Sequence, residues 1–571
     1  MNLRSTRPSG SQNSVLLAIP STLRCPQPLL GVRTAHAGVM GNSQEDNVID
    51  AVRIIAEEEL GGQFWLPDTV VPPQIRVIVS LSTNSAASTA LWRHVTATFK
   101  RDTMMVFSDN EHIVETLTRQ GHTVVTAGNL HAAVRSGVNI WADSHSDLAL
   151  LGALCGAPVS IWHATQEPEI LTHPAAVTWI NQNIAWRNPF TRQTTSMAEA
   201  VRIVSDTKRF IRRTQDIAVC VGMAWWKKQR MREFFSVGRP PPAFRRSAEG
   251  ALHVVGRTPG AIATWTSRTP AKLRRKAARA GVAVCRVEDG FVRSVGLGSD
   301  LLPPSSIVVD RNGIYFDPSR ASDLEIVLNT SRFDDVLIKR ASSLIKTLID
   351  RDVSKYASAE TTTHAIHAPV GRLKILVPGQ VSNDLSIRLG CGEISNNLDL
   401  LKAVRARYPN AHIIFRPHPD VDAGHRPGHV PDDVVAAYAD QIARGGSMVS
   451  LIKQVDELHT MTSLAGFEAL LRGRRVVTYG SPFYAGWGVT QDMGQPMSRR
   501  ARQLTLAELV AGALILYPLY LDPQTQLPCG PELLIERMSE PALWKPLPIV
   551  RLRRAQGRLR NWIRKYWRVN Y

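Results

Sequence analysis

The stretch from Ser463 to Asp492 limits the possible fold of this chain more than any other; it reads SLAGFEALLRGRRVVTYGSPFYAGWGVTQD. Its pattern predicts a short helix from Ser463, a buried strand at RVVTYG, and a loop of glycine, proline and aromatic residues. Free N–H groups at a helix start bind anions, and Ser463 can cap that start or donate to a phosphate. Glu468, one turn further in, suits ribose hydroxyls. The pattern is typical of a nucleotide site at the carboxyl edge of a parallel sheet; the alternative is a capped helix without a ligand.

Length and charge narrow the class of protein. The 571 residues predict two to four domains. The formal net charge of +19 predicts a polyanionic partner, such as nucleic acid, an acidic membrane or phosphorylated substrates. Because no RNA- or DNA-binding motif is present, nucleic acid is not expected as a partner. The cysteines are scattered without a CxxC pair, which predicts reduced thiols of a cytoplasmic protein.

Neither a signal peptide nor a membrane span is predicted. Arg4 and Arg7 precede an apolar run at 15–19, but that run is too short and ends at Pro20. No window reaches the roughly 18 apolar residues that a membrane span needs. The longest candidate, 509–521, contains a proline and is predicted as a core helix.

Strands and helices alternate from about residue 75 onward. The first set of predicted strands is IRVIVSL, TMMVFSD, HTVVTA, VNIWADS and PVSIWHA, with helices at 85–98, from Glu111 and at 146–155 between them. A later set is LKILVPG, AHIIFRPH, MVSLI, ELHTMTS and RVVTYG. The predicted organisation is an irregular segment (1–72), an α/β domain (73–200), a helical connector (201–249), a second α/β domain (250–370), a third α/β domain (371–546) and a basic amphipathic tail (547–571).

The chain contains a candidate internal repeat. SDLALLGALCGAPV, from Ser146, aligns with SLAGFEALLRGRRV, from Ser463, and each segment precedes an apolar strand. Leu151 stands where the second copy has Glu468, so the first copy lacks the carboxylate that would bind a ribose. We interpret 73–200 as a degenerate nucleotide-binding half; chance similarity between two βαβ segments is the alternative.

Polar side chains follow two further strands. VAVCRV is followed by EDGFVRS, which places Glu288, Asp289 and Arg293 at a strand end. Adjacent acids with an arginine and glycines suit a polar ligand, although acidic turns after strands are common. KILV is followed by a glycine-containing loop with Gln380 and Asp384. A single aspartate at that place can equally cap a helix.

The strand HIIF leads into Arg416 and His418. Prolines on both sides of the histidine hold its backbone extended. A fixed imidazole beside Arg416 suits a leaving phosphate, because it can donate a hydrogen bond and act as a general acid. A structural histidine is the alternative.

The loop PFYAGWG completes a set of four clusters. Tyr484 and Trp487 can stack on a base or cover a sugar, or they can form a packed corner. Four clusters at the ends of successive strands in two adjacent α/β units predict a nucleotide at one unit and an acceptor at the other. This is the arrangement of a GT-B glycosyltransferase, a pair of Rossmann-type domains, here preceded by the degenerate α/β domain. Because no DxD-like motif follows a strand, neither a metal nor another cofactor is expected.

Six segments, in order, closely resemble the capsule polysaccharide β-Kdo transferase family of the KpsC/LipB type. They are EDGFVRSVGLGSD, PPSSIVVDRNGIYFD, VPGQVSNDLSIRLG, RPHPDV, TSLAGFEALLRG and PFYAGWGVTQD. The resemblance covers about 250–540 and is strongest to the carboxyl-terminal member of the two modules that the family typically carries. It implies that 250–370 is the acceptor-side α/β domain and that 371–546 is the CMP-sugar-binding α/β domain. It implies transfer of Kdo from CMP-Kdo to a linker on a lysophosphatidylglycerol lipid. It also implies a cytoplasmic protein peripheral to the inner membrane, with other capsule assembly proteins as partners.

The resemblance also implies roles for individual residues. Asp384 matches the nucleophile of a retaining mechanism that passes through a covalent Kdo–Asp adduct. Glu288 matches the acid/base that acts on the acceptor hydroxyl, and His418 matches the group that assists departure of CMP. The implied donor-binding residues are Gln380, Arg416, Ser463 and Glu468. The residues assigned to the acceptor and sugar loop are Asp289, Arg293, Tyr484 and Trp487.

The chain departs from the family pattern in three places. The first module is reduced to 73–200, without an EDG, QxxxD or HP motif, which removes one of two expected activities. Trp265-Thr266 replaces the family's Trp-Gly, and Lys355-Tyr356-Ala357 replaces Lys-Tyr-Asn. Two alternatives of a different kind stay open: a non-catalytic capsule-assembly or export scaffold, and a transferase that uses another nucleotide sugar.

The end of the chain predicts membrane contact. Between Arg551 and Arg568 the sequence has eight basic residues and no acid, with apolar residues at helical spacing. A basic amphipathic helix that contains tryptophan suits an anionic leaflet. A solvated charged tail is the alternative.

Overall fold

The computed structural model describes residues 16–22, 25, 30–33, 45–82, 85–295, 302–353, 356–357 and 365–544. The predicted tail, the glycines at 296 and 298, and Lys355 lie outside these residues. The chain divides into two compact units. Unit 1 comprises Met1–Gln215, Ser236–Pro240 and Thr525–Pro528, and unit 2 comprises Asp216–Phe235, Pro241–Gln524 and Cys529–Tyr571.

Unit 1 contains a six-stranded sheet in the order β4-β3-β2-β5-β6-β7. The strands are β2 (Val77–Ser80), β3 (Met104–Phe107), β4 (Thr123–Val125), β5 (Asn139–Ala142), β6 (Val159–Ile161) and β7 (Glu169–Ile170). All neighbours are parallel except β6 and β7. The strands predicted between residues 75 and 163 are therefore confirmed.

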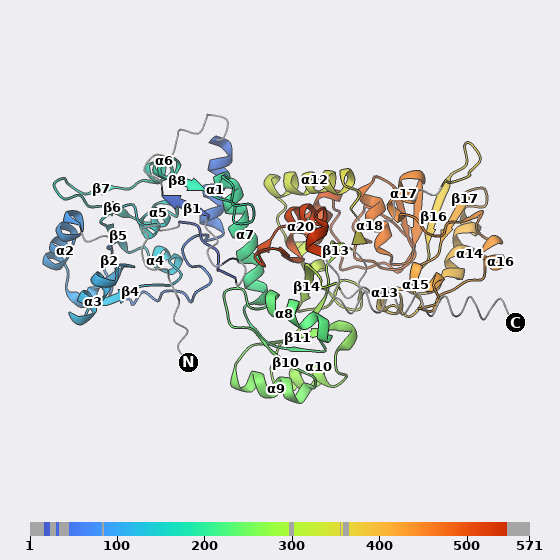
Figure 1. The fold of residues 1–571 in the computed structure, drawn as a ribbon, viewed down its shortest axis with the longest axis horizontal. Helices are drawn as coiled ribbons and strands as arrows, with labels where there is room; N and C mark the ends of the chain where they lie inside the picture. Colours follow the sequence, from blue (N-terminus) through green and yellow to red (C-terminus); the bar gives the residue numbers. More distant parts are fainter. Residues whose placement is uncertain are drawn as a thin grey trace. The chain divides into compact units, whose positions relative to one another are not determined.

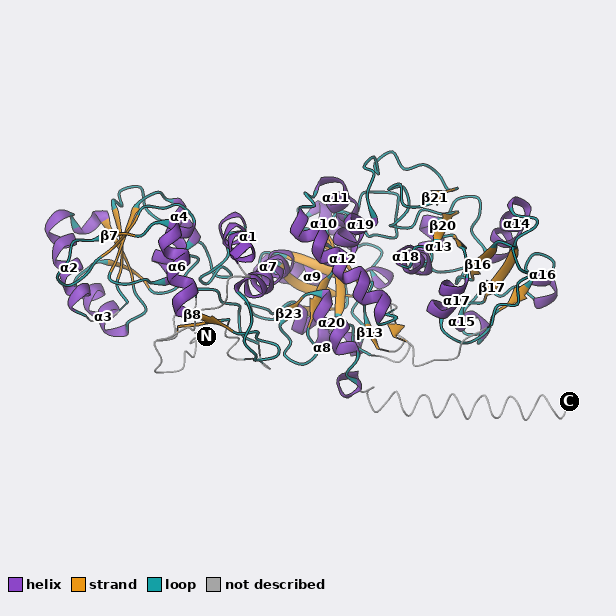
Figure 2. Cartoon of the chain, turned by 90° about the horizontal axis from the view of Figure 1, so that it is seen from above, coloured by secondary structure: helices purple, strands orange, loops and turns teal. Residues whose placement is uncertain are grey.

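Helices cover both faces of this first sheet. Figure 2 shows α2 (Ala86–Thr98) and α3 (Glu111–Arg119) on one side, and α4 (His131–Arg135) and α6 (His173–Asn183) on the other. The helix predicted at 146–155 is α5 (Asp147–Leu154). Val77, Val79 and Leu91 are fully buried between the sheet and α2. This is a doubly wound α/β layer arrangement.

The segment 1–72 is not irregular throughout. Residues Glu45–Glu57 form helix α1, and Gly31–Arg33 form β1, which pairs with β8 (Ile184–Trp186). Helix α1 packs against α7 (Met197–Thr214). The buried Val52 and Ile55 lie on one face of α1, at helical spacing. The sequence interpretation missed this periodic pattern because the polar residues around it are numerous.

Unit 2 contains a seven-stranded sheet in the order β10-β9-β11-β12-β14-β22-β23. The strands are β9 (Ile217–Val221), β10 (Ala243–Arg245), β11 (Ala261–Trp265), β12 (Val284–Asp289), β14 (Ser306–Asp310), β22 (Leu519–Leu521) and β23 (Pro528–Cys529). The four strands from β10 to β12 are parallel, whereas β14 runs antiparallel to both of its neighbours. The range 201–249 is thus helical only in part, because it contributes β9 and β10 to this sheet.

A second sheet of unit 2 has the order β18-β17-β16-β19-β20-β21, and all its neighbours are parallel. The strands are β16 (Lys374–Pro378), β17 (His412–Arg416), β18 (Gln441–Ile442), β19 (Glu457–Thr460), β20 (Arg475–Thr478) and β21 (Gln491–Asp492). Figure 2 shows α14 (Asn397–Arg407) and α16 (Asp432–Ala436) on one side, and α17 (Met448–Gln454) and α18 (Leu464–Leu471) on the other. Ile375, Val377 and Leu400 belong to the buried core of this layer.

The prediction of a strand at MVSLI was wrong. These residues begin α17, and the outer strand of the sheet is β18, which lies just upstream. Val449, Leu451 and Ile452 are buried in the helix. A short apolar run does not distinguish a buried strand from a buried helical turn, which explains the error.

The end of unit 2 returns to the seven-stranded sheet. The core helix predicted at 509–521 ends early: α19 (Leu506–Val510) continues as a π-helical turn over Ala511–Leu516, and β22 then pairs with β14. Pro518 cannot continue a helix. Figure 1 shows α20 (Pro531–Met538), in red, beside the yellow-green α12 (Asp335–Asp350). The segment after about residue 505 therefore contributes to the seven-stranded sheet and not to the β16 sheet.

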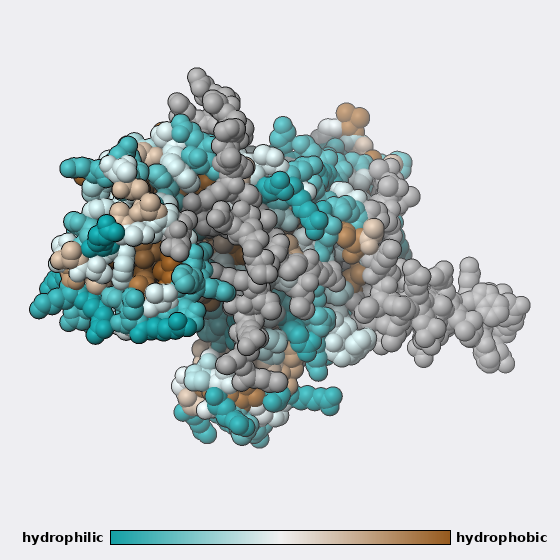
Figure 3. All heavy atoms as spheres, turned by 60° about the vertical axis from the view of Figure 1, so that its left-hand side comes forward, coloured by the Kyte–Doolittle hydropathy of each residue, from teal (hydrophilic) through white to brown (hydrophobic). Residues whose placement is uncertain are grey.

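The described helices include none that is long and apolar enough to cross a bilayer. On the face drawn in Figure 3, most described residues are hydrophilic and apolar residues occupy small separate areas.

Candidate active site

The polar clusters of the β16 sheet lie at the carboxyl ends of its parallel strands. The first strand of this sheet along the chain, β16, lies beside the fourth, β19. The chain leaves these two strands toward opposite sides of the sheet, and a crevice forms at such a point. Gln380 and Asp384 follow β16, Arg416 ends β17 and His418 follows it, and the start of α18 follows β19. The structure thus brings the predicted donor residues to one edge.

Gln380 joins the loop after β16 to the loop after β19. Its side chain is almost fully buried; Oε1 accepts hydrogen bonds from Thr460 Oγ1 and the Thr462 amide, and Nε2 donates to Thr462 Oγ1. Asn397 holds the Gln380 backbone from the other side. Because its amide group is occupied by these contacts, Gln380 fixes the loop that precedes Asp384 rather than facing open space.

Asp384 is the N-cap of α13 (Leu385–Gly390). Its Oδ1 accepts from the Ser386 amide and from Ser386 Oγ, both at 3.0 Å. The capping alternative is therefore the observed local geometry. The side chain is also exposed, and both hydrogen bonds from Ser386 reach Oδ1. Capping holds the carboxylate in one orientation and leaves Oδ2 accessible.

His418 is a half-buried N-cap of the short helix α15 (Pro419–Asp422). Nδ1 accepts from the Asp420 amide at 3.1 Å, which requires that Nδ1 carries no proton and leaves the proton of the neutral ring on Nε2. Burial lowers the pKa of His418 below its ordinary value, with Arg426 acting in the same direction and Asp420 and Asp384 opposing it. A neutral imidazole with an Nε2–H donor results at neutral pH.

Arg416 does not point its guanidinium at open space. It is buried and donates to the carbonyls of Gly445 and Gly446. These bonds hold the loop between β18 and α17. The role of a direct phosphate ligand, which the sequence predicted, would require these contacts to change.

The start of α18 has the capped geometry that the sequence predicted. Ser463 Oγ accepts from the Ala465 amide at 3.2 Å, and the Ser463 amide donates to Thr460 Oγ1. Glu468 lies one turn further in and is buried, with 8% of its surface exposed. Burial lowers the pKa of the Arg472 guanidinium below its ordinary value, and the nearby Glu468 carboxylate opposes this shift. Glu468 therefore lies buried near a cation.

Tyr484 and Trp487 are fully buried. The Tyr484 hydroxyl donates to the Ser463 carbonyl at 2.5 Å, and Trp487 Nε1 donates to the Phe483 carbonyl at 2.9 Å. Burial raises the pKa of Tyr484 well above its ordinary value. Neither ring presents a free face to a ligand in this structure. Their geometry is that of the packed corner, and Tyr484 supports the start of α18.

The acids of the other sheet form a second polar cluster, at the carboxyl end of β12. Asp289 Oδ2 lies 2.9 Å from Arg293 Nε, and Asp289 Oδ1 lies 3.2 Å from Lys227 Nζ. Arg293 is fully buried and also donates to the Leu302 carbonyl. Glu288, on the opposite side of the strand, is half-buried. Asp289 and Arg293 thus form a structural ion pair beside Glu288.

Sequence reasoning missed Lys227. Its ammonium lies 3.1 Å from the centroid of the Trp265 ring and is buried beside Asp289. Burial lowers the pKa of Lys227 to about 8, although Asp289 and Glu288 raise it. The only sequence signal was a lysine after two tryptophans in the segment taken as a connector.

An aromatic contact joins the two clusters. Phe291, which follows Glu288 and Asp289, stacks on Phe483 of the PFYAGWG loop with 4.3 Å between ring centroids. Tyr315 packs edge-on against Phe291, and Phe467 of α18 lies against Phe483. The loop after β12 and the loop after β20 therefore share one core.

The described residues contain no group of three or more histidine, cysteine, aspartate or glutamate side chains placed to hold a metal ion. What they do contain is an exposed carboxylate, a neutral imidazole and a helix start at one sheet edge, and a half-buried glutamate at another. Together these features define an α/β protein with three parallel-rich sheets and with polar sites at the carboxyl ends of strands.

Comparison with known proteins places this chain in a family. A family model described as capsule polysaccharide biosynthesis protein matches residues 260–336 and 331–520, all within unit 2. The lipopolysaccharide-processing protein LpsZ of Rhizobium meliloti is 37% identical over 310 residues, which cover 53% of this chain and 70% of LpsZ. The chain belongs to the capsule polysaccharide biosynthesis protein family.

The capsule polysaccharide modification protein LipA of Neisseria meningitidis serogroup A is 44% identical over 340 residues, which cover 59% of this chain and 47% of LipA. This chain therefore spans about half the length of that relative. Among solved structures, KpsC beta Kdo 2,7 transferase of Thermosulfurimonas dismutans is 33% identical, with 57% of this chain and 98% of that chain covered and a TM-score of 0.48.

Proposed function

We propose that this protein is a glycosyltransferase that moves Kdo from CMP-Kdo to a lipid-linked Kdo acceptor during capsular polysaccharide synthesis. The observation that carries the proposal is the position of the clusters. Asp384, His418 and the start of α18 share one sheet edge, and the Phe291–Phe483 stack links it to the loop after Glu288. Family membership and the six motifs that resemble capsule β-Kdo transferases support the same assignment. The two sheets of unit 2 would form the GT-B pair.

In the proposed reaction, CMP-Kdo lies with its phosphate near His418 and the start of α18, and with its ribose near Glu468. Asp384 Oδ2 attacks the anomeric carbon as the bond to the CMP oxygen breaks, and the Nε2–H of His418 donates to the departing phosphate. A Kdo ester of Asp384 results. Glu288 then accepts the proton of the acceptor hydroxyl as that oxygen displaces Asp384, so the configuration is retained.

Two residues have roles that differ from their first assignment. In this proposal Gln380 and Arg416 position the donor site without touching the donor, because their polar groups are bonded to Thr460, Thr462 and the carbonyls of Gly445 and Gly446. Lys227 positions Asp289 beside the acid/base, through the 3.2 Å ion pair.

The direct test is incubation of the protein with CMP-Kdo and a short Kdo-terminated acceptor, followed by mass spectrometry. We expect the acceptor to gain the mass of Kdo. Acceptor binding without any transfer would favour the scaffold alternative. Transfer from another CMP- or UDP-sugar but not from CMP-Kdo would favour a different donor.

We also propose that the tail at 547–571, which lies outside the described residues, attaches the protein to the inner leaflet. Each cation near an anionic surface contributes about 1 kcal/mol, so eight suffice for reversible attachment. Deletion of 549–571 should release the protein from anionic vesicles, and high salt should have the same effect. Cosedimentation of the truncated protein at low salt would show that the tail is not the anchor.

A further inference from the structure

A pocket of about 260 Å³ opens at the carboxyl ends of β9, β10 and β11, in unit 2. Its walls come from the turn after β9, from the end of β10, from the turn after β11 and from the first residue of α8 (Lys228–Phe234). Gly222, with a φ of +72°, brings two of these turns together, because a Cβ there would lie 2.6 Å from the Arg268 carbonyl oxygen. We call this cavity the basic pocket; its polar lining residues are Lys228, Arg245, Arg246 and Arg268.

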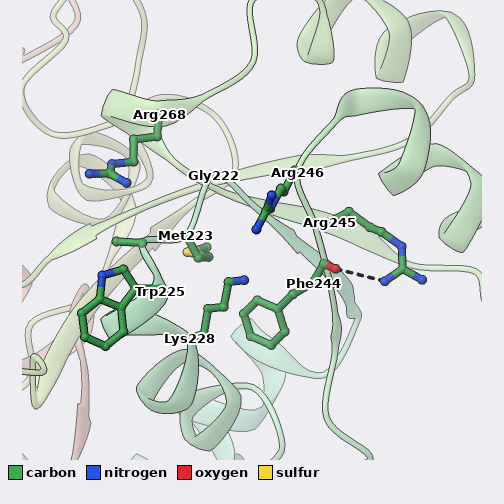
Figure 4. A pocket seen from close by; sticks show the side chains of 9 residues that line it. Gly222, Met223, Trp225, Lys228, Phe244, Arg245, Arg246 and Arg268 are labelled. Atoms are coloured by element: carbon green, nitrogen blue, oxygen red, sulfur yellow. Dashed lines mark hydrogen bonds between the residues drawn. The ribbon is translucent and has the colours of Figure 1, made fainter.

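The basic pocket is lined by four cations and no carboxylate. Within the described part of the chain, the side chains of Lys228, Arg246 and Arg268 form no ion pair or hydrogen bond with another side chain. Figure 4 shows Lys228 and Arg246 directed into the cavity, whereas Arg245 turns away and donates to the Phe244 carbonyl. Cations that lack a protein partner around one cavity raise the local concentration of anions.

An aromatic surface accompanies this charge. Trp225 stands at the mouth of the pocket with 60% of its surface exposed, and Phe244 forms part of the wall. An exposed indole at the mouth of a cavity can gain free energy when a ligand covers it, because burial of apolar surface is favourable. Arginines that can bind a carboxylate or phosphate in bidentate fashion, next to an indole that can cover the apolar face of a sugar ring, suit an acidic or phosphorylated sugar.

One short segment connects the basic pocket to the proposed acid/base. Residues 222–228 run from β9 into α8, and within them Trp225 and Lys228 line the pocket. Lys227 lies between these two and turns the other way, onto Asp289 and the Trp265 ring. A ligand in the pocket therefore lies one residue along the chain from a side chain that contacts the cluster beside Glu288.

We propose that the basic pocket binds an anionic group, a carboxylate or a phosphate, of the acceptor and thereby holds the acceptor chain next to Glu288. This inference rests on the proposed function. It assigns to Lys228, Arg246 and Arg268 a role in binding the acceptor, and to Trp225 contact with a sugar ring. The donor nucleotide is not the occupant, because its proposed site lies at the edge of the other sheet of unit 2.

The test compares Arg246→Gln, Arg268→Gln and Lys228→Gln with Arg279→Gln as a matched control. Arg279 is an exposed arginine at the end of α10 (Leu273–Arg279) and does not line the pocket. Two acceptors are used: a Kdo disaccharide on a neutral aglycone, and Kdo linked to glycerol phosphate. Each is also prepared as its Kdo methyl ester, which removes the carboxylate charge.

We expect each pocket variant to raise the KM for the acid acceptor about tenfold or more, since hydrogen bonds between charged groups are the stronger ones. The kcat at saturating acceptor, the affinity for CMP and the behaviour of Arg279→Gln should stay unchanged. The preference of the wild-type protein for the acid over the methyl ester should shrink in the variants. A KM effect on both acceptors that vanishes with the esters identifies a carboxylate; an effect confined to the glycerol phosphate acceptor identifies a phosphate.

If the wild-type protein transfers Kdo and the pocket variants have the same KM values as the wild-type protein for all four acceptors, the basic pocket does not bind the acceptor. The proposed function then stays intact. A rise in the Kd of CMP would overturn the basic pocket too, in favour of a donor contact. If the wild-type protein transfers nothing, calorimetry with the Kdo disaccharide separates the two proposals. Binding that Arg268→Gln weakens and Arg279→Gln does not would retain the pocket while the transferase fails, and no binding would overturn the pocket as well.

Discussion

The sheet of unit 1 and the β16 sheet of unit 2 have the same strand order, and they differ in what stands at their edges. Numbered along the chain, both follow 3-2-1-4-5-6, the order of a dinucleotide-binding sheet. The helix after the fourth strand is α5 in unit 1 and α18 in unit 2, and each begins at a serine N-cap, Ser146 or Ser463. The two segments of the internal repeat in the sequence therefore form equivalent elements, α5 and α18.

The polar groups at the unit 1 edge form hydrogen bonds with one another. The buried Asp143 accepts from the Ser82 amide, from Ser82 Oγ and from Ser88 Oγ, and Ser80 Oγ bonds Ser146 Oγ. At the unit 2 edge Asp384 is exposed and His418 is half-buried. The same sheet topology can therefore carry polar side chains that bond to one another, as in unit 1, or polar side chains that remain accessible to a ligand, as in unit 2.

The largest expected effect concerns the helix after the first strand, which Ser85 caps in unit 1 and Asp384 caps in unit 2. Asp384→Ser restores the unit 1 cap, so the fold should persist. Loss of the nucleophile should still reduce transfer by roughly 10³-fold or more. The measurement is the transfer rate with CMP-Kdo, with CMP binding as the check on folding. Near wild-type transfer by Asp384→Ser would remove this residue from the mechanism. The control Ser85→Ala should lower stability by about 1 kcal/mol and leave transfer unchanged.

The second effect concerns the equivalent positions Glu468 and Leu151. Glu468→Ala should weaken CMP binding by roughly 1–3 kcal/mol, the cost of a lost hydrogen bond to a charged group. Leu151 is fully buried, so Leu151→Ala should cost about 2–5 kcal/mol of stability through a cavity and leave CMP affinity unchanged. Calorimetry with CMP and thermal unfolding separate the two. If Leu151→Ala weakens CMP binding while Glu468→Ala does not, the assignment of the nucleotide to unit 2 is wrong.

A smaller effect concerns Gly466 and Ala149, which occupy the same turn of α18 and α5. A Cβ at Gly466 would lie 2.2 Å from the Tyr484 hydroxyl oxygen, so only glycine fits there. Gly466→Ala should destabilise unit 2 by about 1–3 kcal/mol, as overpacking does. The reciprocal Ala149→Gly should cost about 1–2 kcal/mol, from lower helix propensity and from loss of a buried methyl group. Denaturant unfolding measures both. A neutral Gly466→Ala would mean that the Tyr484 ring can move aside.

The smallest effect is the pH dependence that His418 contributes at the unit 2 edge. Because burial lowers the pKa of His418, the unfolded chain binds more protons than the folded protein as pH falls below about 6.5. Its contribution to stability is therefore complete above that pH and is lost as pH falls through the range between the unfolded and folded values. His418→Asn keeps a capping side chain and should show a flatter stability profile between pH 7 and 5. An identical profile in both proteins would contradict a neutral His418.

Strand identity was largely accessible from the sequence, because apolar runs between turn residues mark buried parallel strands. Five strands of unit 1 and four of the β16 sheet lie where they were predicted. The errors arose where the local residue pattern fits more than one secondary structure and the surrounding fold decides between them. Met448–Gln454 is apolar enough for either a strand or a helix, and β9 was hidden in a segment dominated by charged and tryptophan residues. The return of β22 to β14 joins residues about 210 positions apart, and no local pattern encodes it.

The candidate site shows the same division residue by residue. Ser463 as a cap and Asp384 and His418 at strand ends followed from sequence spacing, because parallel strands bring their carboxyl ends to one edge. Glu288 was placed at a strand end in the same way, and that strand belongs to the other sheet of unit 2. The hydrogen-bond partners of Gln380 and Arg416 did not follow from the sequence, because they depend on which polar groups the tertiary structure brings near each side chain. For Tyr484 and Trp487 the sequence left ligand contact and a packed corner open, and packing of Tyr484 against Phe467 and Phe483 shows the corner.

By itself the sequence determined the class of this protein: alternating strands and helices, an internal repeat, and four polar clusters that follow strands. These are local properties, set by side-chain periodicity and by turn chemistry. Only the tertiary structure decided which polar groups stay accessible, that Lys227 joins Asp289, and that the basic pocket forms between three turns. Accessibility and charge neutralisation depend on neighbours that are distant in the chain, and folding alone brings those neighbours together.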